Sequence, residues 1–223
     1  MRAARRMASG VPVGGQRRIR EGTDTVISER IGTWVRRYML YVGAWFAKTG
    51  ITPNMATLIG LVLNGVVAVI IGFGYPVIGG VLLLIASASD MVDGAIARAT
   101  GTVSKFGGFF DSTIDRYSEI VVYIGLLAWL MTTGDARVGA MLTLITATGA
   151  LMVSYVRARA EAIGYTASVG LVARPERVVL LALCLIIHRP LWALWILAVL
   201  THITAIWRIV HVYGLVDADE SKR

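Results

Sequence analysis

The chain has 223 residues, of which 56% are hydrophobic and only 16% are charged. Its mean hydropathy of +0.68 excludes an ordinary water-soluble domain of this size. The net charge of +8 would suggest nucleic acid in a soluble protein, but the chain carries no DNA-binding or RNA-binding pattern. Because the basic residues cluster in the N-terminal tail and at the ends of apolar runs, we expect membrane lipids as partners and no nucleic acid.

The first 50 residues precede the apolar part of the chain. Residues 1–25 are rich in arginine and glycine and lack the apolar core of a secretory signal peptide, so we expect a flexible basic cytoplasmic tail. In residues 26–50, apolar and aromatic side chains recur at helical spacing between basic ones. This pattern predicts an amphipathic juxtamembrane helix lying in the interface. A soluble helix packed against a partner is the alternative.

Residues 51–213 are expected to form one membrane domain. Pro53 should break the preceding helix, and Asn54 can cap the next one. The uncharged run 55–89 is too long for one span of about 20 residues and is interrupted near Pro76. The sequence therefore predicts an all-α polytopic protein with six transmembrane helices, near residues 55–73, 77–98, 106–132, 138–156, 175–187 and 190–207. Residues 214–223 are expected to form a cytoplasmic tail.

The distribution of basic residues predicts the orientation of these spans. One set of span ends carries nearly all the lysine and arginine, whereas the loops at the other ends carry little charge. By the positive-inside rule, both termini and the arginine-rich ends face the cytoplasm, in the cell membrane.

Four acidic residues interrupt the second and third predicted spans. Asp90 and Asp93 are three residues apart and Asp111 and Asp115 four apart, so each pair shares a helix face. A carboxylate costs roughly 2.5 to 3.5 kcal/mol at mid-bilayer, so such residues are usually functional. An all-oxygen cluster suits Mg²⁺, Mn²⁺ or Ca²⁺. Arg98, one or two turns beyond Asp93, can bind a phosphate, which together with metal ligands indicates metal-assisted phosphoryl transfer.

The spacing of these residues is the motif D-x2-D-G-x2-A-R-x8-G-x3-D-x3-D, and it resembles the signature of the CDP-alcohol phosphotransferases. The positions that match are Asp90, Asp93, Gly94, Ala97, Arg98, Gly107, Asp111 and Asp115. The resemblance implies that the four aspartates bind divalent ions, most simply two Mg²⁺ ions, with Mn²⁺ as the other choice. It also implies that Asp115 is the general base and that the enzyme is a homodimer.

The resemblance also implies a site for the CDP group. This site would comprise Asn54, Thr57, Gly94, Ala97, Arg98 and Gly107, although capping alone would explain Asn54. Glu119, one turn after Asp115, either supports the metal ligands or is a structural acid paired with Arg116.

Two arginine-bearing segments, SYVRARAEAIG and RPER, resemble the corresponding stretches of the phosphatidylinositol-phosphate synthases of this family. The resemblance implies that the acceptor phosphate is bound by Arg157, Arg174, Arg177 and Arg208. Anchoring at span ends is the alternative for each of them. Arg159 points away from Arg157 on a helix, and can pair with Glu161 or Glu176.

The expected enzyme is thus a phosphatidyltransferase that moves a phosphatidyl group from CDP-diacylglycerol to inositol phosphate and releases CMP. Glycerol 3-phosphate is the alternative acceptor. A cation transporter is an alternative of another class, because buried acids also bind transported ions, but it predicts a midplane site and two related halves. A non-catalytic membrane scaffold leaves the four carboxylates unexplained.

Overall fold

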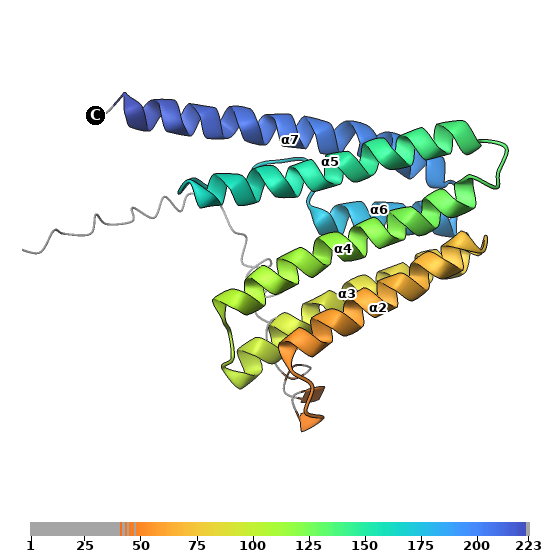
Figure 1. Cartoon of the computed structure of the whole chain (residues 1–223), viewed down its shortest axis with the longest axis horizontal. Helices are drawn as coiled ribbons and strands as arrows, with labels where there is room; N and C mark the ends of the chain where they lie inside the picture. The colour runs from red at the N-terminus through yellow and green to blue at the C-terminus, as the bar shows by residue number, and fades with distance from the viewer. Residues whose placement is uncertain (1–40, 42, 44, 47, 222–223) are drawn as a thin grey trace, which may run out of the picture. The chain divides into compact units, whose positions relative to one another are not determined.

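The computed structural model describes residues 41, 43, 45–46 and 48–221. Across this part of the chain it is all-helical (Figure 1). The helices are α2 (Pro53–Gly72), α3 (Pro76–Thr100), α4 (Lys105–Leu130), α5 (Ala136–Ala162), α6 (Arg174–Ile186) and α7 (Pro190–Glu220). The expected tail 1–25 and most of the expected helix 26–50 lie outside the described residues; residues 41, 43, 45, 46 and 48 are helical.

Local sequence signals account for the helix ends. A proline occupies the first turn of α2, α3, α6 and α7, where its missing N–H group has no partner to lose. The sequence suggested Asn54 as the cap of α2, but the residue that caps it is Thr52. The Thr52 side chain accepts a 3.3 Å hydrogen bond from the Met55 amide. Ser104 caps α4, accepting from the Gly107 amide at 3.0 Å. The turn between α3 and α4 begins at Gly101, whose φ of 68° is left-handed.

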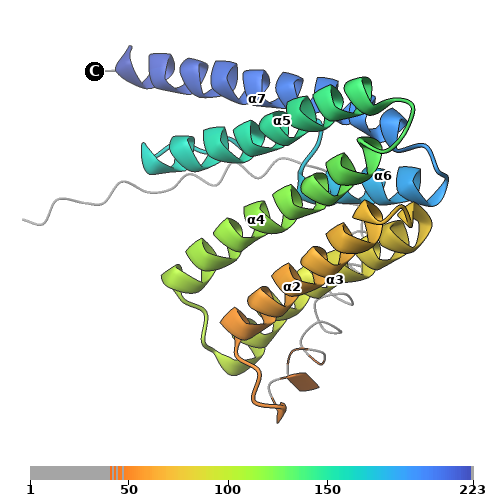
Figure 2. The same ribbon diagram turned by 45° about the vertical axis from the view of Figure 1, so that its right-hand side comes forward.

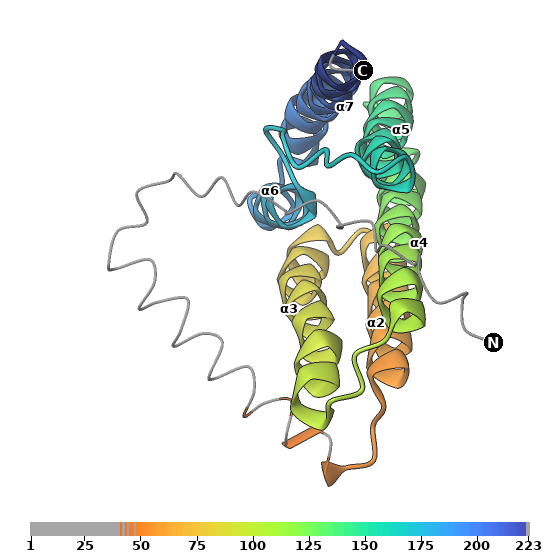
Figure 3. The same ribbon diagram turned by 90° about the vertical axis from the view of Figure 1, so that its left-hand side faces the viewer.

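The six helices pack in a cycle of neighbours. α2 contacts α3 and α4, α3 contacts α6, α6 contacts α7, α7 contacts α5, and α5 contacts α4 (Figure 3). Glycines permit close approach at two of these contacts: a Cβ at Gly125 would come within 2.2 Å of the Ala68 carbonyl oxygen, and one at Gly80 within 2.7 Å of that of Ala182. Such small-residue contacts are typical of helices packed in membranes.

Only four of the described helices are long and apolar enough to cross a membrane, namely α2, α3, α5 and α7. The expectation of an all-α membrane protein is therefore confirmed for four of these helices, and the expected six spans stay a prediction. α4 contains five charged residues among its first 15. α6 has 13 residues and is about 20 Å long, shorter than a hydrocarbon core of about 30 Å. α7 extends to Glu220, so residues 214–220 of the expected cytoplasmic tail are helical.

The chain reverses direction at each connection, so helix ends far apart in sequence gather at one end of the bundle (Figures 1 and 2). The last turns of α3, the start of α4, the end of α5 and the start of α6 lie on that side of the bundle. This arrangement places the acidic motif and the arginine segments at the same end.

Candidate active site

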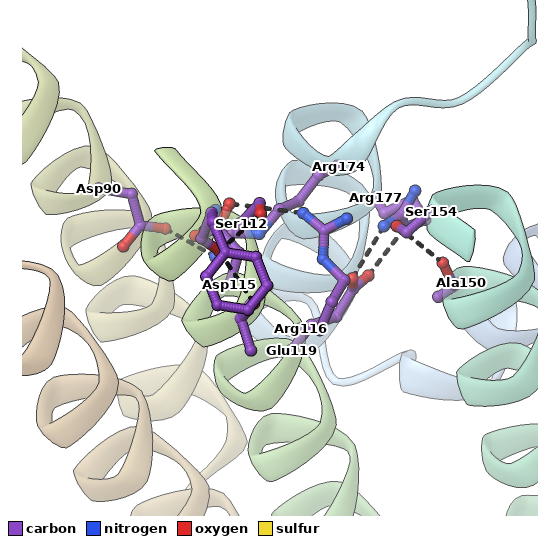
Figure 4. Close-up of polar contacts among 11 residues, drawn as sticks. Asp90, Ser112, Asp115, Arg116, Glu119, Ala150, Ser154, Arg174 and Arg177 are labelled. Atoms are coloured by element: carbon purple, nitrogen blue, oxygen red, sulfur yellow. Dashed lines mark hydrogen bonds and ion pairs between the residues drawn. The ribbon is translucent and has the colours of Figure 1, made fainter. Parts of the chain in front are cut away.

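The four aspartates of the motif fall into two pairs in space, and each pair combines one residue of α3 with one of α4. Asp90 and Asp115 are bridged by Arg174, the first residue of α6 (Figure 4). Arg174 Nη2 lies 2.8 Å from Asp90 Oδ2, and its Nη1 lies 2.8 Å from Asp115 Oδ1. Asp115 also has Arg116 Nη2 at 3.5 Å from its other oxygen.

The second pair consists of Asp93 and Asp111, which line the same cavity. Asp93 accepts a 2.7 Å hydrogen bond from Thr57 Oγ1 of α2 and a further one from the Gly94 amide. Among the ion pairs of the described residues, none involves Asp93 or Asp111. Two carboxylates held together without a cation repel each other, which favours binding of a positive ion or a proton between them.

A cavity of about 510 Å³ opens beside this second pair. We call it the main cavity; its walls are Thr52, Pro53, Asn54, Thr57, Asp93, Gly94, Ala97, Arg98, Thr102, Val103, Ser104, Gly107, Gly108 and Asp111. All six residues that the sequence suggested for the CDP group are on this list. Its volume is typical of sites for small molecules and cofactors.

The absence of side chains at two motif glycines keeps the main cavity open. A Cβ at Gly94 would lie 3.1 Å from Arg98 Nη1, and one at Gly107 would lie 3.0 Å from the Ser104 hydroxyl. Thr52 caps α2, so the side chain of Asn54 is not needed for capping. It is therefore available to a ligand in the main cavity.

The donor chemistry of the four aspartates fits hard divalent cations, which prefer carboxylate oxygens. As arranged, the described residues contain no group of three or more acidic, histidine or cysteine side chains that could hold an ion. Arg174 stands between Asp90 and Asp115 and fills the space where their oxygens would converge. The set therefore fits divalent cations provided that the Arg174 side chain moves.

Arg177 is buried and pairs with an acidic residue of the protein. Its side chain is 1% exposed and forms a bidentate pair with Glu119 of α4, with Nε and Nη2 both 2.8 Å from the carboxylate oxygens. The sequence left Glu119 between a supporting role at the metal site and a pair with Arg116; its partner is Arg177. This pair lies one turn from the Arg174–Asp115 pair and fixes α6 against α4 (Figure 4).

Arg208 and Arg157 are also placed away from the aspartates. Arg208 of α7 is 5% exposed and donates to two backbone oxygens, from Nε to Val169 at 2.8 Å and from Nη1 to Val153 at 2.7 Å. It thereby ties the loop that precedes α6 to α5. Arg157 is 57% exposed and pairs with Glu161 at 2.9 Å, a partner that the sequence had suggested for Arg159.

Of the four arginines expected at the acceptor phosphate, the structure thus brings one, Arg174, into contact with the motif aspartates. Sequence reasoning missed both ion-pair partnerships between α4 and α6. The signal was present in the spacing: Arg174 and Arg177 are three apart, and Asp115 and Glu119 four apart, so two helices can align two arginines with two acids.

Comparison with known proteins agrees with this geometry. Residues 50–207 match the family model of the CDP-alcohol phosphatidyltransferases. The chain is 35% identical to the archaetidylinositol phosphate synthase of Pyrococcus horikoshii over 176 residues, covering 78% of this chain and 90% of that protein. It is 32% identical to the phosphatidylinositol phosphate synthase of Streptomyces avermitilis over 225 residues, covering 91% and 90%.

Solved structures similar to this chain come from the same family of enzymes. The crystal structure of Mycobacterium tuberculosis phosphatidylinositol phosphate synthase with CDP-DAG bound superposes with a TM-score of 0.75 at 29% identity, covering 79% of this chain and 94% of that one. The structure of the same enzyme with manganese and citrate also gives 0.75, covering 78% and 88%. With four apolar helices and this motif, the chain is an integral membrane protein, and it belongs to the CDP-alcohol phosphatidyltransferase family.

Proposed function

We propose that this protein transfers a phosphatidyl group from CDP-diacylglycerol to inositol phosphate, giving phosphatidylinositol phosphate and CMP. One observation carries the proposal: the six residues expected to bind CDP and two of the four motif aspartates line the same cavity. The solved relative binds CDP-DAG, and the curated relatives named above make inositol phosphate lipids, which supports both substrates.

The proposed nucleotide site is the main cavity. Arg98 supplies a cation for the diphosphate, and Asn54 and Thr57 supply polar groups from the start of α2. Gly94, Ala97 and Gly107 contribute small walls that let the ligand approach the backbone.

Asp90, Asp93, Asp111 and Asp115 are the proposed ligands of two divalent cations. The relative that was crystallised with manganese supports a divalent ion, and we propose Mg²⁺ as the ion used. Bound cations would neutralise the diphosphate and the charge that develops on the leaving CMP.

The chain's own residues would direct the transfer. Asp115, which is only 17% exposed, takes the proton from the attacking hydroxyl of the acceptor. The acceptor oxygen then forms a bond to the lipid-bearing phosphorus, and the bond from that phosphorus to the CMP oxygen breaks. Arg174 lies next to Asp115 and is the proposed contact for the phosphate of the acceptor.

The other arginines have different proposed roles. Arg157 is exposed and its pair with Glu161 is weak in water, so it can turn toward an acceptor phosphate at little cost. We propose that Arg208 holds the loop before α6 in place and that Arg177 fixes α6 on α4, which together position Arg174.

The two proposed substrates come from different environments, the membrane and water. One substrate carries acyl chains and the other is water-soluble, so the reaction requires an interface. We propose that α4 and α6 complete a six-helix membrane domain, that the arginine-rich end faces the cytoplasm, and that the enzyme is a homodimer.

The deciding experiment measures CMP release by the purified protein given CDP-diacylglycerol and one acceptor at a time. We expect release with inositol phosphate. Release with glycerol 3-phosphate alone would refute the proposed acceptor, and metal flux into liposomes without any CMP release would indicate a transporter. Asp115→Asn should abolish turnover while Mn²⁺ binding is largely kept; full activity of this variant would exclude the base role.

A further inference from the structure

Arg174 holds two aspartates that the proposed metal site also requires. It is the one described basic residue that pairs with both an α3 carboxylate and an α4 carboxylate, each at 2.8 Å. Its Nε is buried and makes no hydrogen bond within the described chain. A buried donor without a partner is costly, so this position does not satisfy the whole guanidinium group.

The charges of the site indicate what happens when cations bind. The four aspartates carry four negative charges, and Arg174 compensates part of them through Asp90 and Asp115. Two divalent cations would neutralise all four aspartates, leaving the positive charge of Arg174 beside two further positive ions. That arrangement is repulsive unless the guanidinium moves or gains an anion.

We propose that Arg174 competes with divalent cations for Asp90 and Asp115, and that its displacement by those cations makes it available to the phosphate of the acceptor. Metal loading and acceptor binding are then coupled through one side chain. The identity of the acceptor rests on the proposed function, whereas the competition does not.

The surroundings of Arg174 allow the side chain to move while its backbone stays. One turn further along α6, Arg177 is locked to Glu119 in a buried bidentate pair. The loop before α6 is held by Arg208 through the Val169 oxygen. The Arg174 side chain as a whole is 18% exposed, so it is not sealed off from solvent.

The first test measures Mn²⁺ binding alone, in detergent solution, by the paramagnetic resonance signal of free Mn²⁺. We expect Arg174→Gln to bind Mn²⁺ about tenfold more tightly, because a unit charge about 5 Å from a divalent ion has an effect of this order even in water. Arg174→Lys should be intermediate, since one ammonium group cannot bridge both carboxylates in the same way. Arg159→Gln removes an exposed arginine that forms none of the described ion pairs, and should change Mn²⁺ affinity far less.

The second test measures binding of inositol phosphate, and separately of inorganic phosphate, with and without Mn²⁺. In the parent protein Mn²⁺ should raise phosphate affinity at least about fivefold, a usual size for coupling between sites. Arg174→Gln should lose most of this increase in phosphate affinity. The part of the increase that remains in the variant measures direct contact of phosphate with the metal.

Two results would overturn the proposal. One is an Mn²⁺ affinity in Arg174→Gln that is unchanged or weaker while the thermal transition is intact. The other is full coupling in that variant. If inorganic phosphate shows coupling but inositol phosphate does not bind, the competition stands and the proposed acceptor is wrong.

Discussion

The buried pair between Arg177 and Glu119 gives the sharpest test of how this bundle is held together. Both side chains are nearly inaccessible, at 1% and 7% exposed, and two 2.8 Å hydrogen bonds join them. In Arg177→Met the Glu119 carboxylate would be left in the core without its cation. Breaking a buried pair in this way costs about 3–5 kcal/mol.

The single cysteine supplies the assay. Cys184 is buried in the core, so a maleimide fluorophore that reacts with it on heating reports unfolding. A loss of about 3–5 kcal/mol should lower the midpoint by roughly 6–20 °C for a chain of this length. Glu119→Leu combined with Arg177→Met should recover most of the loss, because both charges are then removed.

The matched control is Arg159→Met, an exposed arginine at the same end of the bundle, with an expected change within about 0.5 kcal/mol. An Arg177→Met protein that melts like the parent, yet needs much more inositol phosphate for half-maximal rate, would refute the structural role. It would instead make Arg177 a ligand of the acceptor.

Three further predictions concern packing, the hydrogen bond to Asp93, and the metal. Gly125→Ala should lower the midpoint, since its Cβ would lie 2.2 Å from a carbonyl oxygen and overpacking costs about 1–3 kcal/mol, whereas Gly65→Ala, with nothing within 4 Å, should leave it unchanged or raise it. Thr57→Val should weaken Mn²⁺ binding about tenfold or more through loss of the hydrogen bond to Asp93, and Thr57→Ser should keep it; equal affinities would disprove the support role. Chelation should stop CMP release, with recovery on adding Mg²⁺ or Mn²⁺, and persistent activity in excess chelator would count against a metal enzyme.

Much of the fold was predictable because hydropathy and proline position are local signals. The prolines at 76 and 190 mark helix starts directly, and α6 begins one residue before the proline that the sequence suggested. The number of membrane-crossing helices was less predictable, because α4 carries charges and α6 is short.

The sequence by itself determined which residue types share a helix face and at what spacing, because the motif fixes both. Asp93, Asp111, Arg98 and the two motif glycines line one cavity, which agrees with the site that the family resemblance implied. Only the tertiary structure decided how the arginines are used, since an arginine near a span end has several acids and carbonyl groups within reach. In the packed bundle, Arg177 of α6 pairs with Glu119 of α4, Arg174 pairs with one aspartate of α3 and one of α4, and Arg208 of α7 binds backbone oxygens. Ion pairing between helices depends on distances that no single helix defines.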